Sequence, residues 1–354
     1  MNMKNNILKS LFIALTLVLG VNNAWAVNHT GGYVYFLKPS TWTESTVMMF
    51  IGKSNYTSVY TMTKVENTDN LYRYTMPSWD GATYVAFANA GSAWGSGNWG
   101  PSNRTNASHY TNVYNNYGFN SGSYYVVVPA STSNNAGITI NYTGTTASTI
   151  NLTTKAIASD KAHGTVSVSG YYMSAYNKAS TRSAVSSSAS NATASTTLAP
   201  GSTATFNATA STGYEFEGWY DAATGGNQLS KNSTYTFKYD ISYTGKTVYA
   251  RFKAKQYTIT YKDQGNVTFT GTHASGYPTK HTYGTATTLS IATKTGYTFG
   301  GWYKDSGLTT IWNFENDTIT GPTTIYAKWT EKVVEPEPDP DPDPDPDPDP
   351  DPDP

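Results

Sequence analysis

Two tryptophans lie five residues apart in a glycine-rich stretch, Trp94-Gly-Ser-Gly-Asn98-Trp99-Gly. A stretch of this composition cannot easily bury both indoles, and a water-exposed indole is unfavourable unless it serves recognition. Paired indole faces stack on the C–H faces of pyranose sugars, and a neighbouring amide such as Asn98 bonds their hydroxyl groups. The pattern therefore predicts a glycan-binding platform, with core packing of the two indoles as the alternative.

Residue types that carry out catalysis are sparse and scattered. The chain has no cysteine, and its five histidines lack the spacing of metal ligands. No nucleophile elbow, phosphate-binding loop or dinucleotide-binding motif occurs in its required context. The carboxylates near the tryptophans, Glu44, Glu66, Asp69 and Asp80, are too few and too loop-bound to suggest a glycosidase pair. We expect no enzyme activity, no metal site and no cofactor.

The platform needs a scaffold, and the composition favours strands over helices. Tyrosine, serine, threonine, asparagine and glycine are abundant, while 13% of residues are charged. Short alternating segments punctuated by Gly, Asn and Pro predict a β-sandwich over residues 27–130. The predicted strands cover residues 33–37, 47–51, 71–74, 83–87 and 124–128. Residues 131–150 are expected to form either a linker or the last strand followed by a linker.

The predicted sandwich resembles a known family. The segment Val34-Tyr-Phe-Leu-Lys-Pro39-x-x-Trp42, the strand at residues 70–74 and the tryptophan loop are similar to starch-binding carbohydrate-binding modules. The resemblance implies that Trp94, Asn98 and Trp99 contact the ligand, with Trp42 as a further contact. A tryptophan beside a strand is more often a core residue, so core packing is the alternative for Trp42.

A phrase of eight residues occurs twice in the second half of the chain. Gly213-Tyr-Glu-Phe-Glu-Gly-Trp-Tyr220 is matched by Gly296-Tyr-Thr-Phe-Gly-Gly-Trp-Tyr303, and each phrase is followed by an alternating aromatic segment. The leading glycine suits a turn, and the alternation places aromatic side chains on one sheet face. A duplicated unit of this size predicts a modular array.

The two phrases resemble the internalin B-type repeat, also called the Listeria-Bacteroides repeat, of bacterial surface proteins. The resemblance implies a small β-rich, β-grasp-like module that spaces or presents another domain. We place a divergent copy at residues 151–255 and a closer copy at 256–330. Trp219, Trp302 and Trp329 are expected in the cores, and the Ser/Ala-rich residues 183–197 in an exposed loop.

Both ends of the chain have distinct compositions. Residues 1–26 have the basic, apolar and small-residue regions of a signal peptide, so no membrane span is expected after its removal. Residues 331–354 form a Pro-Asp tail that cannot fold into a packed structure. It is either a free acidic tail or part of a longer reading frame. Between residues 27 and 334, 21 bases exceed 14 acids by about 7, but the bases are scattered, which excludes nucleic acid as a partner.

Two functions fit these observations. The first is an exported, non-catalytic cell-surface protein that binds an α-glucan-like glycan and uses its repeats as a spacer. The second is an adhesive stalk that contacts a host or bacterial protein, with the tryptophans as packing. Both place the chain in the cell envelope, on the cell surface or outside the cell.

Overall fold

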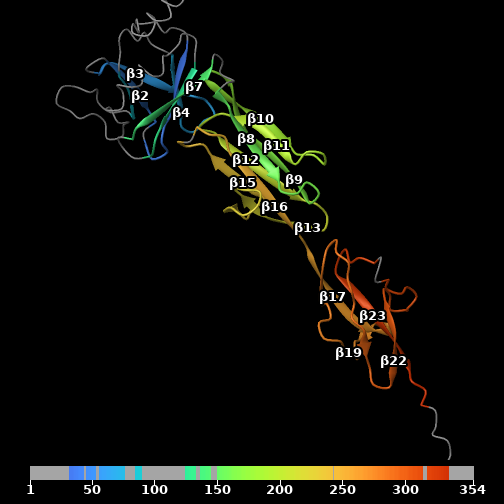
Figure 1. Ribbon diagram of the computed structural model, residues 1–354. Coiled ribbons are helices and arrows are strands. Elements are labelled where there is room, and N and C mark those ends of the chain that lie inside the picture. The colour runs from blue at the N-terminus through green and yellow to red at the C-terminus, as the bar shows by residue number, and fades with distance from the viewer. Residues whose placement is uncertain are drawn as a thin grey trace, which may run out of the picture. The chain divides into compact units, whose positions relative to one another are not determined.

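Strands dominate the structure. The computed structural model describes residues 32–43, 45–52, 56–75, 84–89, 124–132, 136–144, 150–241, 243–313 and 317–334. Within these ranges the chain forms strands and short 3-10 segments but no α-helix, so the mainly-β prediction is confirmed. The chain divides into two compact units, Met1–Lys253 and Ala254–Pro354 (Figure 1).

The first seven strands form one path of neighbours, which we call the N-terminal sheet. Their order is β5-β2-β3-β4-β1-β6-β7. Phe36 and Phe87 stack with their ring centroids 4.4 Å apart although their strands are not neighbours, so the path folds over itself into two layers. The strands are β1 (Tyr33–Leu37), β2 (Val47–Gly52), β3 (Tyr56–Lys64), β4 (Leu71–Thr75), β5 (Tyr84–Asn89), β6 (Tyr124–Pro129) and β7 (Ile138–Gly144).

β7 and β3 are the two strands of this sheet for which the sequence made no firm prediction. Residues 131–150 were expected to be either a linker or a last strand followed by a linker. β7 lies in this segment and pairs antiparallel with β6, so the segment contributes a strand. β3 was not predicted. It pairs with β2 along most of its length and reaches β4 through Thr63 and Lys64, which joins the two layers.

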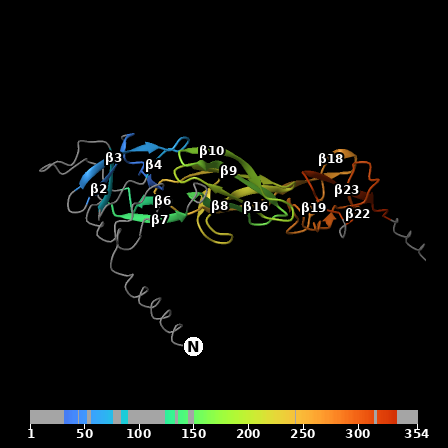
Figure 2. The same cartoon turned by 90° about the horizontal axis from the view of Figure 1, so that it is seen from above.

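The first repeat is built from two sheets. One has the order β10-β9-β12-β15 and the other β11-β8-β16-β13-β14. Figure 2 shows β9 and β10 on one side and β8 and β16 on the other. Trp219 and Phe206 lie in the core between them, both 0% exposed. The strands are β8 (Leu152–Ala158), β9 (Gly164–Ala175), β10 (Lys178–Ser186), β11 (Thr193–Leu198), β12 (Thr203–Ala210), β13 (Tyr214–Tyr220), β14 (Gln228–Ser230), β15 (Thr234–Lys238) and β16 (Thr247–Ala254).

The expectation of an exposed loop at residues 183–197 was wrong. β10 runs through Ser186 and β11 begins at Thr193, so only residues 187–192 connect them. Ala194 and Leu198 are fully buried in alternation with exposed or half-buried hydroxyl residues. Small and hydroxyl-bearing residues resemble a loop in composition, but strand preference depends on the neighbours of the strand more than on intrinsic propensity.

The second unit holds the second repeat. β17 runs parallel to β23, and β22 pairs antiparallel with the other side of β23. Trp302 and Trp329 are 1% and 6% exposed and Trp219 is 0% exposed, which confirms the predicted core positions of all three repeat tryptophans. The elements are β17 (Gln256–Asp263), the 3-10 helix η3 (Gln264–Asn266), β18 (Val267–Thr268), β19 (Thr272–His273), β20 (Lys280–Thr282), β21 (Ala292–Thr293), β22 (Tyr297–Tyr303) and β23 (Thr323–Glu331).

The duplicated phrase performs the same task in both repeats. In each case it forms the strand beside the last strand, and the first strand lies parallel to that last strand. The Trp219 indole N–H donates to the Ser233 carbonyl at 3.1 Å, and the Trp302 indole N–H donates to the Ser290 carbonyl at 2.8 Å. Each large ring is therefore buried with its one polar group satisfied.

Paired glycines explain how β22 places its aromatic side chains. Strict alternation would send Phe299 and Trp302 to opposite faces, since they are three residues apart. The pairing with β23 shifts between these two residues, and Gly301 has a φ of 104°, in a region that favours glycine. The bulge resets the alternation, so both rings pack in one core.

The two repeats differ at one linked pair of positions. In the second repeat, the Trp329 indole N–H donates to Asp263 Oδ1 at 2.7 Å, and Asp263 is 5% exposed. In the first repeat the position of Trp329 is occupied by Phe252, and the strand register puts Ala158 in the place of Asp263. Phenylalanine has no N–H to satisfy, so a buried carboxylate is needed only where the tryptophan occurs.

Acid is expected to weaken the second repeat. His273 packs between Tyr277 and Phe269 with centroid distances of 3.8 and 4.2 Å, and burial lowers its pKa. Burial also lowers the pKa of His281, which contacts the Thr287 hydroxyl. Burial favours the neutral form of both rings in the folded state, so their stabilising contribution is complete above the unfolded pKa of about 6.5 and is lost as pH falls below it.

Thermal unfolding of the whole chain between pH 7.5 and 5.5 tests this expectation. The transition of the second unit should shift to lower temperature as pH falls, and the double variant His273→Gln/His281→Gln should flatten that dependence. An unchanged pH dependence in the double variant would assign the effect to other groups.

Candidate functional site

β1 and β6 are buried on both faces, which marks the side of the N-terminal sheet where another body is packed. Val34 and Phe36 of β1 contribute to the core between the two layers, whereas Tyr35 and Leu37 point the other way. Val126 of β6 also faces away from that core and is 0% exposed. Strands buried on both faces carry continuous apolar runs instead of alternating ones. The run Tyr33–Leu37 has this form.

The first repeat covers this second face. Met173 of β9, with Ala179 and Ala199, joins the apolar cluster that holds Tyr35 and Leu37. All five residues are 0% or 1% exposed. We call this cluster the junction core; its other fully or largely buried members are Val65, Leu71, Val126, Val128 and Ile150. One continuous apolar core therefore connects the N-terminal sheet with the first repeat.

Backbone hydrogen bonds cross the junction. The Glu66 N–H donates to the Asn177 carbonyl at 3.0 Å, and the Ala179 N–H donates to the Glu66 carbonyl at 2.9 Å. The Asp69 N–H donates to the Gly201 carbonyl at 2.9 Å. These bonds fix the loop between β3 and β4 against the repeat, because they satisfy backbone groups that need partners when water is excluded.

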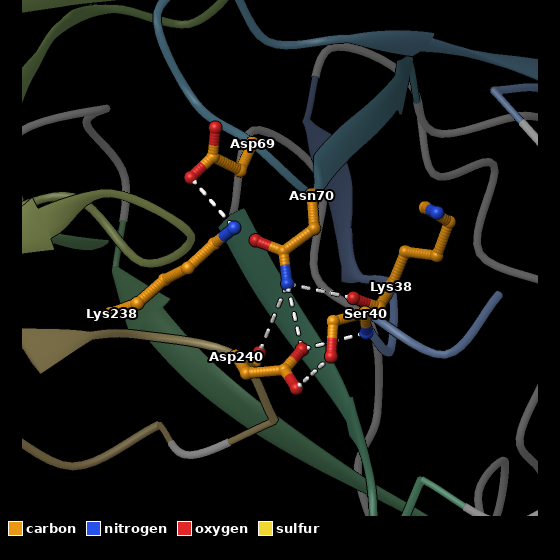
Figure 3. A network of polar contacts seen from close by, with 6 residues as sticks. All are labelled: Lys38, Ser40, Asp69, Asn70, Lys238 and Asp240. Carbon is orange, nitrogen blue, oxygen red and sulfur yellow. Dashed lines mark hydrogen bonds and ion pairs between the residues drawn. The ribbon is translucent and has the colours of Figure 1, made fainter. Parts of the chain in front are cut away.

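A carboxylate of the repeat organises the polar side of the junction, as Figure 3 shows. Asp240 accepts the Ser40 N–H at 2.9 Å, the Ser40 hydroxyl at 2.7 Å and the Asn70 amide N–H at 3.0 Å. The same amide nitrogen donates to the Lys38 carbonyl at 2.7 Å. Charge-assisted bonds to several donors hold a carboxylate in one orientation. Asp240 thus ties the segment after β15 to two separate loops of the N-terminal sheet.

The ion pairs at the junction contribute less. Lys238 lies 3.0 Å from Asp69, and Lys178 lies 3.7 Å from Glu66. All four side chains are at least half exposed, where solvent screening leaves such pairs worth about 0–1 kcal/mol. The junction core and the bonds to Asp240 therefore provide most of the stabilisation.

Replacing Gly201 by alanine is expected to loosen the junction. Gly201 has a φ of 72°, and an added Cβ would lie 2.7 Å from Asn70 Oδ1 and 3.1 Å from the Leu71 nitrogen. The variant combines backbone strain with a clash, for a loss of about 1–3 kcal/mol in the unfolding free energy of the first unit. Chemical denaturation measures that loss. Gly225→Ala is a matched control, because Gly225 also has positive φ and no atom within 4 Å of the added Cβ.

The predicted glycan-binding residues fall into two groups. Trp94, Asn98 and Trp99 lie outside the described residues. Trp42 is 2% exposed and packs against Phe36 with a centroid distance of 5.6 Å. A ring buried in this way has no free face for a sugar, so its position agrees with the alternative of core packing.

No cluster of three or more His, Asp or Glu side chains that could hold a metal ion occurs among the described residues. Nowhere in the described ranges does the chain form an apolar helix of the length that a bilayer requires. Among the described residues, the polar contacts of Asp240 join the N-terminal sheet to the first repeat.

Comparison with known families places both repeats. Residues 257–328 match the Listeria-Bacteroides repeat domain. Residues 179–256 match the divergent InlB B-repeat domain. The predicted repeat family is confirmed for these segments. Neither match reaches the N-terminal sheet, whose resemblance to starch-binding modules stays a prediction.

Relatives with curated names share a limited part of their length with this chain. Internalin H of Listeria monocytogenes serovar 1/2a is 36% identical over 121 residues, which is 34% of this chain and 20% of that protein. A provisionally named Gly-rich membrane protein of Evansella cellulosilytica is 32% identical over 120 residues, 33% of this chain and 12% of that protein. The chain thus spans a fifth or less of these two relatives.

Among solved structures, the Bacillus anthracis TIE protein aligns with 85% of this chain and 51% of its own. The TM-score is 0.26 and the sequence identity is 8%, values too low to relate the two folds. The repeat matches and the relatives' names are compatible with a non-catalytic role at a bacterial surface.

Proposed function

We propose that this chain is an exported, non-catalytic protein of the bacterial cell surface whose repeats present its N-terminal domain for binding. The junction core is the observation that supports this proposal most. A repeat that shares a core with the domain beside it fixes that domain's orientation, and a rigid mount reduces the entropy lost on binding. The matches of both repeats to surface-protein families support the location.

Surface labelling of intact cells tests the location. An antibody raised against residues 27–253 should label intact cells of the source bacterium, and brief protease treatment of those cells should remove the label. A cytoplasmic enzyme that stays protected during the same treatment serves as the control for cell integrity. Labelling that appears only after cell lysis would contradict the proposal.

The ligand that we propose for the N-terminal domain is an α-glucan-like glycan bound through Trp94, Asn98 and Trp99. The sequence pattern of two indoles and an amide supports this choice. Calorimetric titration of the chain from Val27 to Pro354 with maltoheptaose and amylopectin should give saturable binding. The double variant Trp94→Ala/Trp99→Ala should lose that binding and keep its unfolding temperature.

Tyr171→Ala is the matched control for that titration, since Tyr171 is a 36% exposed aromatic residue of the first repeat. It should bind the glycan as the unchanged chain does. A chain that binds no glycan of the panel, together with a double variant that unfolds, would assign the indoles to packing. The adhesive alternative, in which the domain contacts a protein, would then replace the glycan proposal.

A further inference from the structure

The sheet face that the first repeat covers continues beyond the cover as a row of tyrosines. Along this face Leu37 lies opposite Leu71, Tyr35 opposite Arg73, and Tyr33 opposite Tyr124. Beneath the repeat, Leu37, Leu71 and Tyr35 are 0% exposed. Tyr33 and Tyr124 are half-buried. The cover therefore ends within the sheet and leaves aromatic rings at its rim.

The turn between β9 and β10 adds a third ring to this rim. Tyr176 is 43% exposed and stacks on Tyr33, with centroids 4.7 Å apart and planes 12° from parallel. Tyr33 stacks in turn on Tyr124, with centroids 5.5 Å apart. We call Tyr33, Arg73, Tyr124 and Tyr176 the tyrosine–arginine ledge. The Tyr35 hydroxyl donates to the Tyr176 carbonyl at 2.8 Å, which holds the turn against the sheet.

Arg73 places a positive charge in the ledge. Its guanidinium carbon lies 5.3 Å from the ring centre of Tyr33 and 5.0 Å from that of Tyr176. Its Nε is enclosed without a hydrogen-bond partner, and no carboxylate of the described residues pairs with this side chain. Arg73 therefore lies beside the stacked pair of Tyr33 and Tyr176. A guanidinium is planar, and its fork of N–H donors matches the geometry of a carboxylate.

We propose that the tyrosine–arginine ledge binds a glycan that carries carboxylate groups, such as a uronic acid polymer. The exposed ring of Tyr176 offers a face for a pyranose, and Arg73 offers donors and charge for the carboxylate beside that pyranose. The site needs the N-terminal sheet and the first repeat together, because three members come from one and Tyr176 from the other. It is separate from the predicted platform of Trp94 and Trp99.

The small number of residues in the ledge favours a sugar over a folded protein. A stable protein interface covers about 800 Å² per partner and contains buried apolar anchors. The exposed positions around the ledge are polar, with Glu66, Lys178 and Thr75 among them. Three rings and one cation match the chemistry of a few acidic sugar units.

Calorimetric titration with trigalacturonate tests the ledge, using the chain from Val27 to Pro354 in low salt. Maltotriose and hexaglutamate are the comparison ligands. Trigalacturonate should bind at the ledge. Any maltotriose binding should be unaffected by Arg73→Gln, because maltotriose lacks the carboxylates and the proposed α-glucan platform is a separate site. Arg73→Gln should weaken trigalacturonate binding at least ten-fold. Tyr176→Ala should weaken it as well, while Tyr176→Phe should retain it.

Lys328→Gln is the matched control, since Lys328 is a cation 5.7 Å from the ring of Tyr303 in the second unit and its loss changes the net charge equally. It should leave binding unchanged. Arg73→Lys keeps the charge and serves if Arg73→Gln fails to fold, with intermediate affinity expected. Maltotriose binding that Arg73→Gln weakens equally, equal binding of hexaglutamate, trigalacturonate binding that Arg73→Gln leaves unaffected, or no binding of trigalacturonate would overturn the proposal. None of these outcomes bears on the surface location or on the α-glucan titration.

Discussion

Replacing Met173 by alanine should destabilise the N-terminal sheet and the first repeat together. Met173 is 1% exposed and lies in the junction core with Tyr35 and Leu37, which belong to the other body. Truncating a buried methionine costs about 2–5 kcal/mol, through lost burial and the cavity that remains. Because one core serves both bodies, that loss should lower protection against hydrogen exchange equally in β1 and in β12. Mass spectrometry of exchanged peptides measures both strands in one experiment.

The control for this variant lies two residues away on the same strand. Tyr171→Ala removes a 36% exposed side chain and should leave exchange in β1 unchanged. The peptides of β22, in the second unit, should keep their protection in both variants. Separate responses of β1 and β12 to Met173→Ala would contradict the shared core, since each body would then unfold by itself.

Replacing Asp263 by alanine should destabilise the second unit by roughly 2–4 kcal/mol. The change leaves the buried indole N–H of Trp329 without an acceptor and removes the acceptor of the Thr270 N–H, which lies 3.1 Å from Asp263 Oδ2. Lys294, 3.9 Å from that carboxylate, loses its ion-pair partner too. Chemical denaturation of the whole chain gives the free energy of unfolding for this unit.

The first repeat supplies the compensating change. It combines Phe252 with Ala158 where the second repeat combines Trp329 with Asp263. Adding Trp329→Phe to Asp263→Ala removes the orphaned donor, so the double variant should lose less stability than the sum of the two single variants. A double-mutant cycle measures that coupling, expected at about 0.5–3 kcal/mol for groups in direct contact. Strict additivity would show that the indole is satisfied in another way.

Much of the repeat architecture could be predicted because it depends on local pattern. The phrase Gly-Tyr-x-Phe-x-Gly-Trp-Tyr contains a turn glycine, an alternating aromatic strand and a large ring beside a glycine, and each feature has one structural solution. Gly213 and Gly296 have φ values of 82° and 79°, as turn glycines should. The strands beginning at Tyr33 and Leu71 were predictable for the same reason, since alternation and aromatic content are local signals.

The junction could not be predicted in the same way, because it joins residues far apart in the chain. Met173 meets Leu37 across more than a hundred positions, and no local pattern selects that partner. A signal was nevertheless present. The runs Tyr33–Leu37 and Tyr124–Val128 are apolar at every position, which indicates burial on both faces and therefore a second covering body. Trp42 illustrates the opposite difficulty, since the same indole that suits a sugar also suits a core.

The burial of β1 and β6 on both faces also affects how this gene can recombine. Recombination between residues 144 and 150 would separate the two halves of the junction core and leave each product with an exposed apolar face prone to aggregation. Recombination at Lys255 would leave intact every core described above, because none of them crosses from one unit to the other. We therefore expect genomes to reshuffle the second repeat as a cassette, and to transmit the N-terminal domain and the first repeat as one gene segment.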